Sequence, residues 1–125
     1  MDKVFIIEDN PLMSDLLKSL LTLEGYQVES NENHKDVYSA LINYQPDFIL
    51  LDVHLRLGNG KQMNGFELLD QIRSNEKTKH LKVILSSGMD YSQESDKKGA
   101  DGYLQKPYLP EDLIKLMKEL RVRRD

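Results

Sequence analysis

Short hydrophobic runs, each ending at polar or turn residues, recur along the chain. The most apolar of them are Val4–Ile7, Phe48–Leu51, Val83–Leu85 and Tyr103–Leu104. Runs of this kind, bounded by turn residues, are typical of fully buried strands. Residues 26–29 alternate between apolar and polar side chains, which predicts a further strand nearer the edge of a sheet. Five strands are therefore expected, over residues 4–7, 26–29, 48–51, 81–86 and 102–105.

Hydrophobic residues at helical spacing fill the intervals between these strands. Asn10 favours a helix N-cap and Pro11 suits a first helical turn, while Gly25 is typical of a helix end. Further helices are expected over residues 34–44, after Gly65 and from about Pro110 onwards. Residues 89–98 are almost entirely polar, so any helix there is predicted to be short and poorly anchored.

This alternation of strands and helices predicts an α/β fold with a doubly wound, five-stranded parallel sheet covered on both faces. A length of 125 residues suits one domain over residues 1–125, and a hydrophobic content of 39% is enough for one core. No internal repeat or second domain is apparent.

Composition narrows the function. A formal net charge of -4, with 30% charged residues, does not favour direct binding to nucleic acid or to a membrane surface. The absence of cysteine excludes disulfides, thiolate metal sites and a cysteine nucleophile. No apolar segment approaches the roughly 20 residues needed to cross a bilayer, and the N-terminus shows no signal-peptide pattern. A cytoplasmic protein is therefore expected.

Acidic residues follow two of the buried strands. Glu8 and Asp9 come after the first strand, and Asp52 comes after the third. In an open parallel sheet the carboxyl ends of the strands lie along the edge that binds ligands. Three clustered carboxylates repel one another, and Mg²⁺, which prefers oxygen ligands, relieves that repulsion. Each acid alone would more simply cap a loop or helix, but together they predict a magnesium site.

Other polar side chains end the remaining strands. Lys106, before Pro107, could pair with a phosphate or with Asp52, although a lone lysine at a turn is usually a surface residue. The Lys106–Pro107 bond could be cis. Ser86 and Ser87 end the fourth strand, where a hydroxyl could donate to a phosphoryl oxygen, but such pairs more often only begin a loop.

Alternative chemistries find less support. The histidines His34, His54 and His80 lack the spacing of metal ligands and are expected at the surface or in loops. There is no glycine-rich loop of the dinucleotide or nucleotide type. The serines lack the neighbours that a hydrolase needs.

The ordered set of these residues resembles the receiver domain of two-component response regulators, of the chemotaxis-regulator type, over essentially the whole chain. The resemblance rests on Glu8–Asp9, Asp52, Ser86 and the segment 99–107 around the fifth strand. It implies a (βα)5 flavodoxin-like fold with strand order 2-1-3-4-5.

The resemblance also implies a phosphorelay function. Asp52 would take a phosphoryl group from a phosphohistidine on a sensor histidine kinase or a histidine phosphotransfer protein. Asp9 and Asp52 would bind Mg²⁺ directly and Glu8 through water, and the backbone carbonyl of His54 would complete the protein ligands. The protein would not be an enzyme, although it would assist its own phosphorylation and dephosphorylation.

Three residues would carry the response. Lys106 would pair with the acyl phosphate, Ser86 would hydrogen-bond a phosphoryl oxygen and move towards it, and Tyr103 would turn inward when Ser86 moves. Without the resemblance, a strand tyrosine such as Tyr103 is usually a core residue with its hydroxyl at the rim. The change would pass to a downstream effector protein or output domain.

Two departures and two alternatives remain open. Residues 53–64 form a longer loop than is usual in the family, without its common proline, and residues 89–98 are unusually polar. The same fold could serve as a pseudo-receiver, a docking module that is not phosphorylated. A phosphatase with an aspartyl nucleophile would need a second aspartate two residues later, where this chain has His54 and Pro11.

Overall fold

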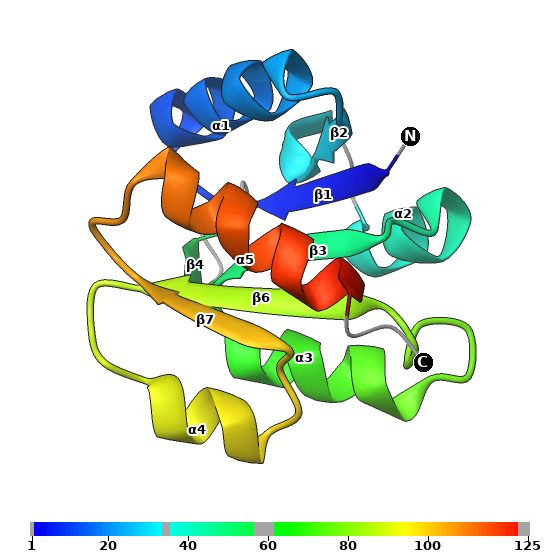
Figure 1. Ribbon diagram of the computed structural model, residues 1–125. Helices are drawn as coiled ribbons and strands as arrows, with labels where there is room; N and C mark the ends of the chain where they lie inside the picture. The colour runs from blue at the N-terminus through cyan, green and yellow to red at the C-terminus, as the bar shows by residue number, and fades with distance from the viewer. Residues whose placement is uncertain (1, 34–35, 57–61, 123–125) are drawn as a thin grey trace.

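Five parallel strands form the central sheet of the computed structural model, which describes residues 2–33, 36–56 and 62–122. The strands lie in the order β2-β1-β3-β6-β7 (Figure 1). Their bounds are Lys3–Ile7 for β1, Gln27–Ser30 for β2, Phe48–Asp52 for β3, Lys82–Ser87 for β6 and Gly102–Gln105 for β7. Counted along the chain, these five strands have the order 2-1-3-4-5, so the predicted receiver topology is confirmed.

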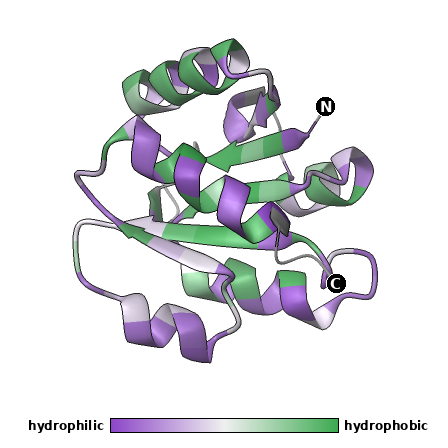
Figure 2. Cartoon of the chain, in the orientation of Figure 1, coloured by the Kyte–Doolittle hydropathy of each residue, from purple (hydrophilic) through white to green (hydrophobic). Residues whose placement is uncertain are grey.

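Helices cover both faces of this sheet. One face carries α1 (Pro11–Leu23) and α5 (Pro110–Val122), whose leucines pack on Val4 and Ile6 of β1. The other face carries α2 (Val37–Tyr44) and α3 (Gly65–Ser74), which pack on Phe5 and Ile7 of the same strand. Because successive strand residues point to opposite faces, each buried strand contributes to both layers. Figure 2 shows these apolar strands between the helices, with polar residues on α4 and α5 and hydrophobic residues along much of α1.

The predicted helix ends of α1 are confirmed. The side chain of Asn10 accepts hydrogen bonds from the backbone N–H groups of Leu12 and Met13, at 3.0 and 3.2 Å. Gly25 follows the helix with a φ of 96°, a left-handed conformation that glycine adopts without a steric penalty. The predicted second helix begins later than expected, at Val37 after the N-cap Asp36, and residues 34–35 lie outside the described part of the chain.

The segment after Asp52 differs from the predicted loop. It contains two short antiparallel strands, β4 (His54–Arg56) and β5 (Gln62–Asn64). Each strand has three residues, of which only the central one is hydrophobic, so their pairing leaves little hydrophobic signature in the sequence. Residues 57–61, which complete the predicted long loop, lie outside the described residues.

The polar segment after β6 forms a short helix, α4 (Ser92–Lys97), as expected. Of its six residues only Ser95 is buried. A short 3-10 helix, η1 (Asn31–Asn33), follows β2. Among the described residues, no helix combines the length and the apolar character that a membrane span requires.

Candidate functional site

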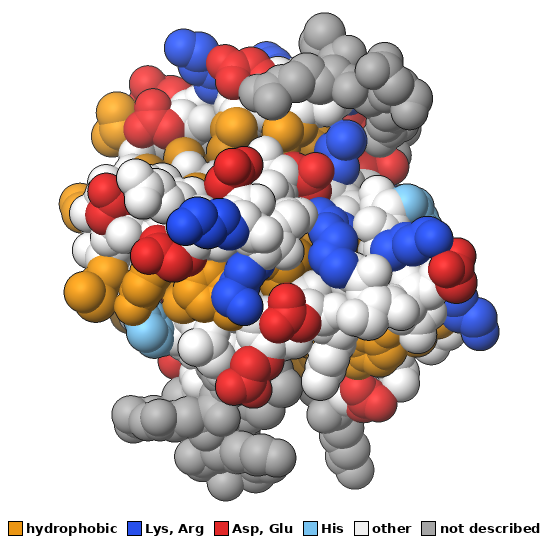
Figure 3. All heavy atoms as spheres, turned by 90° about the horizontal axis from the view of Figure 1, so that it is seen from below, with side chains coloured by type: hydrophobic (Ala, Val, Ile, Leu, Met, Phe, Trp, Pro, Cys, Tyr) orange, Lys and Arg blue, Asp and Glu red, His pale blue; other side chains and the backbone are white. Residues whose placement is uncertain are grey.

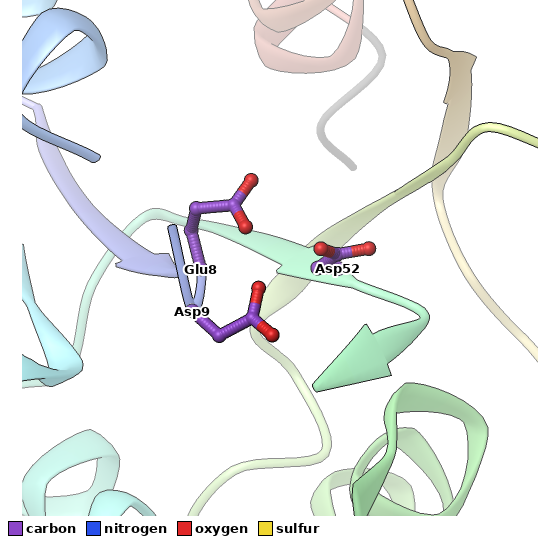
Figure 4. A group of neighbouring side chains, drawn as sticks. All are labelled: Glu8, Asp9 and Asp52. Carbon is purple, nitrogen blue, oxygen red and sulfur yellow. The ribbon is translucent and has the colours of Figure 1, made fainter. Parts of the chain in front are cut away.

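The acids predicted to form a cluster meet at the carboxyl ends of β1 and β3. These strands are direct neighbours, with Ile7 paired to Leu51, so the residues that follow them lie at the same edge of the sheet. One oxygen each from Glu8, Asp9 and Asp52 lies within 4.8 Å of the others, and the carboxylates point towards a shared space (Figure 4). Glu8 and Asp52 are only 5% and 8% exposed, whereas Asp9 faces solvent.

Lys106 supplies the positive charge of this cluster. Its Nζ atom donates to Glu8 Oε1 at 2.9 Å and to Asp52 Oδ2 at 3.2 Å. Burial by itself would lower the pKa of Lys106, but the hydrogen bond to Glu8 and the charges of Asp52 and Glu8 outweigh it and raise the pKa. The lysine therefore stays protonated at neutral pH. Its peptide bond to Pro107 is cis.

The cluster gathers three carboxylates at one edge of the sheet. One oxygen of each lies within 4.8 Å of the others, and two of the three side chains, Glu8 and Asp52, are buried. Closely spaced carboxylate oxygens are hard ligands of the kind that Mg²⁺ takes in proteins. These residues therefore fit a divalent cation, and Glu8, Asp9 and Asp52 form a group that could hold one.

The main chain around Asp52 is tightly held. The N–H of Val53 donates to the Ser86 carbonyl at 2.9 Å, and the N–H of Gly65 donates to the Val53 carbonyl at 2.6 Å. The N–H of His54 donates to Asp52 Oδ1 at 3.3 Å. The two ends of the β4–β5 hairpin thus fix the backbone that carries the Asp52 carboxylate. The role of the His54 carbonyl as a metal ligand remains a prediction.

The two serines that end β6 differ in their contacts. Ser86 is buried and stands in register with Asp52 on the neighbouring strand. Ser87 is also buried and points to the opposite face of the sheet; its Oγ accepts a hydrogen bond from the Met89 N–H at 3.2 Å. Its carbonyl accepts from the Lys106 N–H at 2.7 Å.

Tyr103 lies beside the second of these serines. Its hydroxyl donates to the Ser87 carbonyl at 3.4 Å and also to the Met89 carbonyl. The ring packs partly buried against the core on the α3 side of the sheet. From the sequence, a hydroxyl of either serine could donate to a phosphoryl oxygen, and the resemblance assigns this role to Ser86. Two adjacent serines cannot be distinguished without knowing which strand residues face each other.

This arrangement suits one kind of chemistry. A carboxylate held between an ammonium group and an acidic metal-binding pair can accept a phosphoryl group, because such a transfer needs positioning and charge neutralisation more than covalent help from the protein. Lys106, after β7, contacts both Asp52 and Glu8. Asp52 is the acid of the cluster at the end of β3, and its oxygen lies within 4.8 Å of oxygens of Glu8 and Asp9, which follow β1.

Comparison with known proteins identifies the family. A family model described as the response regulator receiver domain matches residues 4–118. The chain belongs to this family. The match confirms the resemblance inferred from the sequence, while one domain over the whole range 1–125 remains a prediction.

Several relatives span the whole chain or nearly so. Protein PilH of Pseudomonas aeruginosa is 31% identical over 92% of this chain and 93% of its own length. A protein named DNA-binding dual master transcriptional regulator RpaA, from Synechocystis, is 29% identical over the whole chain but only 51% of its own length. The chain therefore spans about half the length of some curated relatives and most of others.

Solved structures show the same fold. Chemotaxis protein CheY4 of Vibrio cholerae superimposes with a TM-score of 0.82 and 25% identity, over 96% of this chain and 98% of that one. A CheY-like receiver domain protein from Methanospirillum hungatei gives a TM-score of 0.81 and 28% identity, over 98% and 95% of the two chains.

Proposed function

We propose that this receiver domain is a phosphoryl-accepting switch in a two-component phosphorelay and that Asp52 is the acceptor. The observation that carries the proposal is that the Asp52 carboxylate lies 3.2 Å from Lys106 Nζ and has an oxygen within 4.8 Å of oxygens of Glu8 and Asp9, the acidic pair that follows β1. A phosphoryl group on Asp52 would therefore lie close to both an ammonium group and a group of acids that could hold a cation.

The transfer follows from these contacts. An oxygen of Asp52 attacks the phosphorus of a phosphohistidine, the phosphorus–nitrogen bond breaks, and the imidazole nitrogen keeps the electron pair and takes up a proton. Lys106 neutralises charge on the transferred group, as a positioned cation does in a water-poor site. Held by Glu8, Asp9 and Asp52 with the His54 carbonyl, Mg²⁺ would supply further neutralisation and orient the phosphoryl oxygens.

The response begins at the end of β6. Phosphorylation adds about -1.5 to -2 charges and three acceptor oxygens at one point, and a nearby hydroxyl donates to them. Ser86 is the first candidate because it is in register with Asp52. Ser87 is a second candidate, because its carbonyl accepts from both Tyr103 and Lys106. Movement of either serine would disturb the hydroxyl contacts of Tyr103.

The partners follow from the chemistry of the transfer. The donor is a protein phosphohistidine, on a sensor histidine kinase or a histidine phosphotransfer protein. Helix α1 begins two residues after Asp9, and its outer side exposes Leu12, Leu16 and Leu23, which offer such a donor an apolar surface that starts beside the acceptor. The recipient is a downstream effector protein or an output domain.

Direct contact with nucleic acid and with membranes is not part of the proposal. On the face of the molecule that carries α3 and α4, lysine and arginine side chains are interspersed with acidic ones (Figure 3). Such mixing favours solvation over binding to a polyanion. A cytoplasmic location agrees with a kinase donor that uses ATP.

The decisive experiment replaces the acceptor. Asp52→Asn keeps the size of the side chain but removes the nucleophilic carboxylate, so incubation with acetyl phosphate and Mg²⁺ should label the wild type and not the variant. Intact-mass spectrometry measures the label, and Asp70→Asn, at an exposed position on α3, is the matched control. Equal labelling of wild type and Asp52→Asn would exclude Asp52, and no labelling of the wild type would favour the pseudo-receiver.

A paired experiment assigns the switch hydroxyl. The variants Ser86→Ala and Ser87→Ala each remove one hydroxyl. The variant that removes the hydroxyl bound to the phosphoryl group should be labelled about tenfold more slowly than wild type, the value of one charge-assisted hydrogen bond. The other variant should label at the wild-type rate. A loss confined to Ser87→Ala would move the role to that residue, and no loss in either would remove this part of the proposal.

A further inference from the structure

The β4–β5 hairpin places an aromatic ring against the segment that leads from β6 into α4. The imidazole of His54 lies 5.8 Å from the ring of Tyr91, centroid to centroid, at an interplanar angle of 55°. Tyr91 in turn makes an edge contact with Phe66 at the start of α3, with centroids 5.6 Å apart and the rings at 90°. We call His54, Tyr91 and Phe66 the aromatic clasp.

The clasp matters because α4 is largely exposed, with Ser95 its only buried residue among 92–97. Tyr91 is the N-cap residue of α4 and its own side chain makes no capping hydrogen bond, although Asp90 Oδ1 accepts a hydrogen bond from the Ser92 N–H at 3.1 Å. Between Gly88 and Lys98, all of which the structure describes, Tyr91 is the only hydrophobic side chain that packs against the core. The one buried residue of the helix, Ser95, contributes a hydroxyl without a partner among the described residues.

The clasp also touches the acceptor site directly. The backbone N–H of His54 donates to Asp52 Oδ1, and its ring rests on Tyr91. The base of the hairpin is rigid, because Gly65 packs on the backbone of Val53 and Asp52. A new ligand on Asp52 Oδ1 would therefore displace the His54 N–H. A shift of His54 would change its ring contact with Tyr91, and so reach α4 without involving Tyr103.

From these contacts we infer that the aromatic clasp holds α4 in its unphosphorylated position and forms a second path, through His54 and Tyr91, from Asp52 to α4. The inference rests on the proposed function, since it concerns the regulation of the same acceptor. A contact that favours one of two states opposes any ligand that favours the other. The clasp therefore opposes the phosphorylated state, and weakening it favours that state.

The test compares two histidine variants. His54→Ala removes the imidazole ring from the clasp. His80→Ala is the control, because the ring of His80 is exposed and contacts Gln45, the C-cap residue of α2. In the protein without phosphodonor, His54→Ala should speed hydrogen exchange about threefold to tenfold, the range expected for one aromatic pair. The amides to follow are those that donate to α4 and adjoining carbonyls, namely Ser95, Lys98, Gly99 and Ala100.

A second measurement uses beryllofluoride, an anion that mimics a phosphoryl group on a carboxylate. In the presence of Mg²⁺, His54→Ala should bind it about threefold to tenfold more tightly than wild type, while His80→Ala should match wild type. His54→Phe keeps an aromatic ring at this position and should restore both values. In a double-mutant cycle, adding His54→Ala to Tyr91→Ala should change little, because the contact is already lost.

Three results would overturn the inference: unchanged α4 exchange in His54→Ala, additive effects in the double-mutant cycle, or weaker beryllofluoride binding by a folded variant. Failure of the wild type to bind beryllofluoride would contradict the proposed function instead. The exchange experiment would still decide whether the clasp holds α4, so the two failures are distinguishable.

Discussion

Helix α1 comes after the acids Glu8 and Asp9, and helix α4 comes after the serines Ser86 and Ser87. The two helices are held in place very differently. α1 has 13 residues, a side-chain N-cap from Asn10, and Leu17 and Leu21 buried in the core. α4 has six residues, an N-cap residue, Tyr91, whose own side chain makes no capping hydrogen bond, and Ser95 as its one buried residue. Burial of leucine side chains contributes roughly 1.5–3 kcal/mol each, so α1 is fixed where α4 is not.

The difference matches the work that each side is proposed to do. The carboxylates before α1 must keep their separation for a metal ion and a phosphoryl group, and such geometry needs packed support. The serines before α4 must respond to the phosphoryl group, and elements that move in switching come from the less stable parts of a fold. We call β1, α1 and α5 the fixed half of the molecule and the segment from the end of β6 through α4 the movable half; the acceptor Asp52 lies between them.

The prediction with the largest expected effect compares the truncation of one buried side chain in each helix. Leu21 is 1% exposed, and Leu21→Ala should lower the free energy of unfolding by about 2–5 kcal/mol, because it leaves a cavity between α1 and the sheet. Ser95 is as deeply buried, but its Oγ has no partner among the described residues, so Ser95→Ala should change stability by less than about 0.5 kcal/mol. Urea unfolding followed by circular dichroism measures both.

Similar losses in the two variants would contradict the contrast. A large loss in Ser95→Ala would mean that α4 is an integral part of the cooperative unit. A small loss in Leu21→Ala would mean that the α1 side can relax around the missing side chain, so it would not provide the fixed support inferred for the acids.

A second comparison uses two glycines on the two sides of Asp52. A Cβ at Gly65 would lie 2.8 Å from the Val53 Cα and closer still to the Asp52 carbonyl oxygen. At Gly88, in the turn towards α4, no described heavy atom beyond the chain neighbours lies within 4 Å of such a Cβ. Gly65→Ala should therefore cost about 1–3 kcal/mol through forced backbone shifts, and Gly88→Ala less than about 0.5 kcal/mol.

The two glycine variants should also differ in the rate at which Asp52 is labelled. Because Gly65 packs on the backbone of Asp52, its substitution should also slow labelling by acetyl phosphate, whereas Gly88→Ala should label normally. Denaturant titration and labelling rates supply the two readouts. If Gly65→Ala labelled at the wild-type rate, the hairpin base would not be needed to position the acceptor.

The sequence predicts the fixed half of the molecule better than the movable half. The apolar runs that become β1 and β3 locate Glu8 and Asp52 because burial on both faces leaves an unmistakable pattern and parallel strands end together. The cap at Asn10 is equally local, since the side chain bonds to residues two and three positions later. These features depend on neighbouring residues or on simple periodicity.

What escapes prediction depends on residues far apart in the chain. The β4–β5 pairing is made by strands of three residues with one hydrophobic residue each, which is too short for a period to mark them. The contact of His54 with Tyr91 joins residues 37 positions apart, and nothing in the sequence around either indicates the other. Ser87 could not be distinguished from Ser86 until the strand register was known. Each is a tertiary contact without local signal.

The smallest expected effect again belongs to the α1 side. Tyr108 follows Lys106–Pro107 and packs into the core shared by α1 and α5, and this burial raises its pKa from 10.0 to about 12. The folded protein therefore keeps the phenol neutral at a pH where the unfolded chain ionises. Stability from this group is complete below pH 10 and is lost as the pH rises from 10 to 12, by on the order of 1 kcal/mol.

Tyr108→Phe isolates this contribution. The variant lacks the ionising hydroxyl, so its free energy of unfolding should fall less steeply than that of the wild type between pH 10 and 12. Lys106, whose pKa is also raised, loses stability in the same direction as pH rises, but it is present in both proteins and largely cancels in the difference. Urea titrations at pH 7, 10, 11 and about 12 measure that difference. Parallel curves over this range would show that the phenol is not held in the α1–α5 core, and the fixed half would then stop short of the loop that carries Lys106.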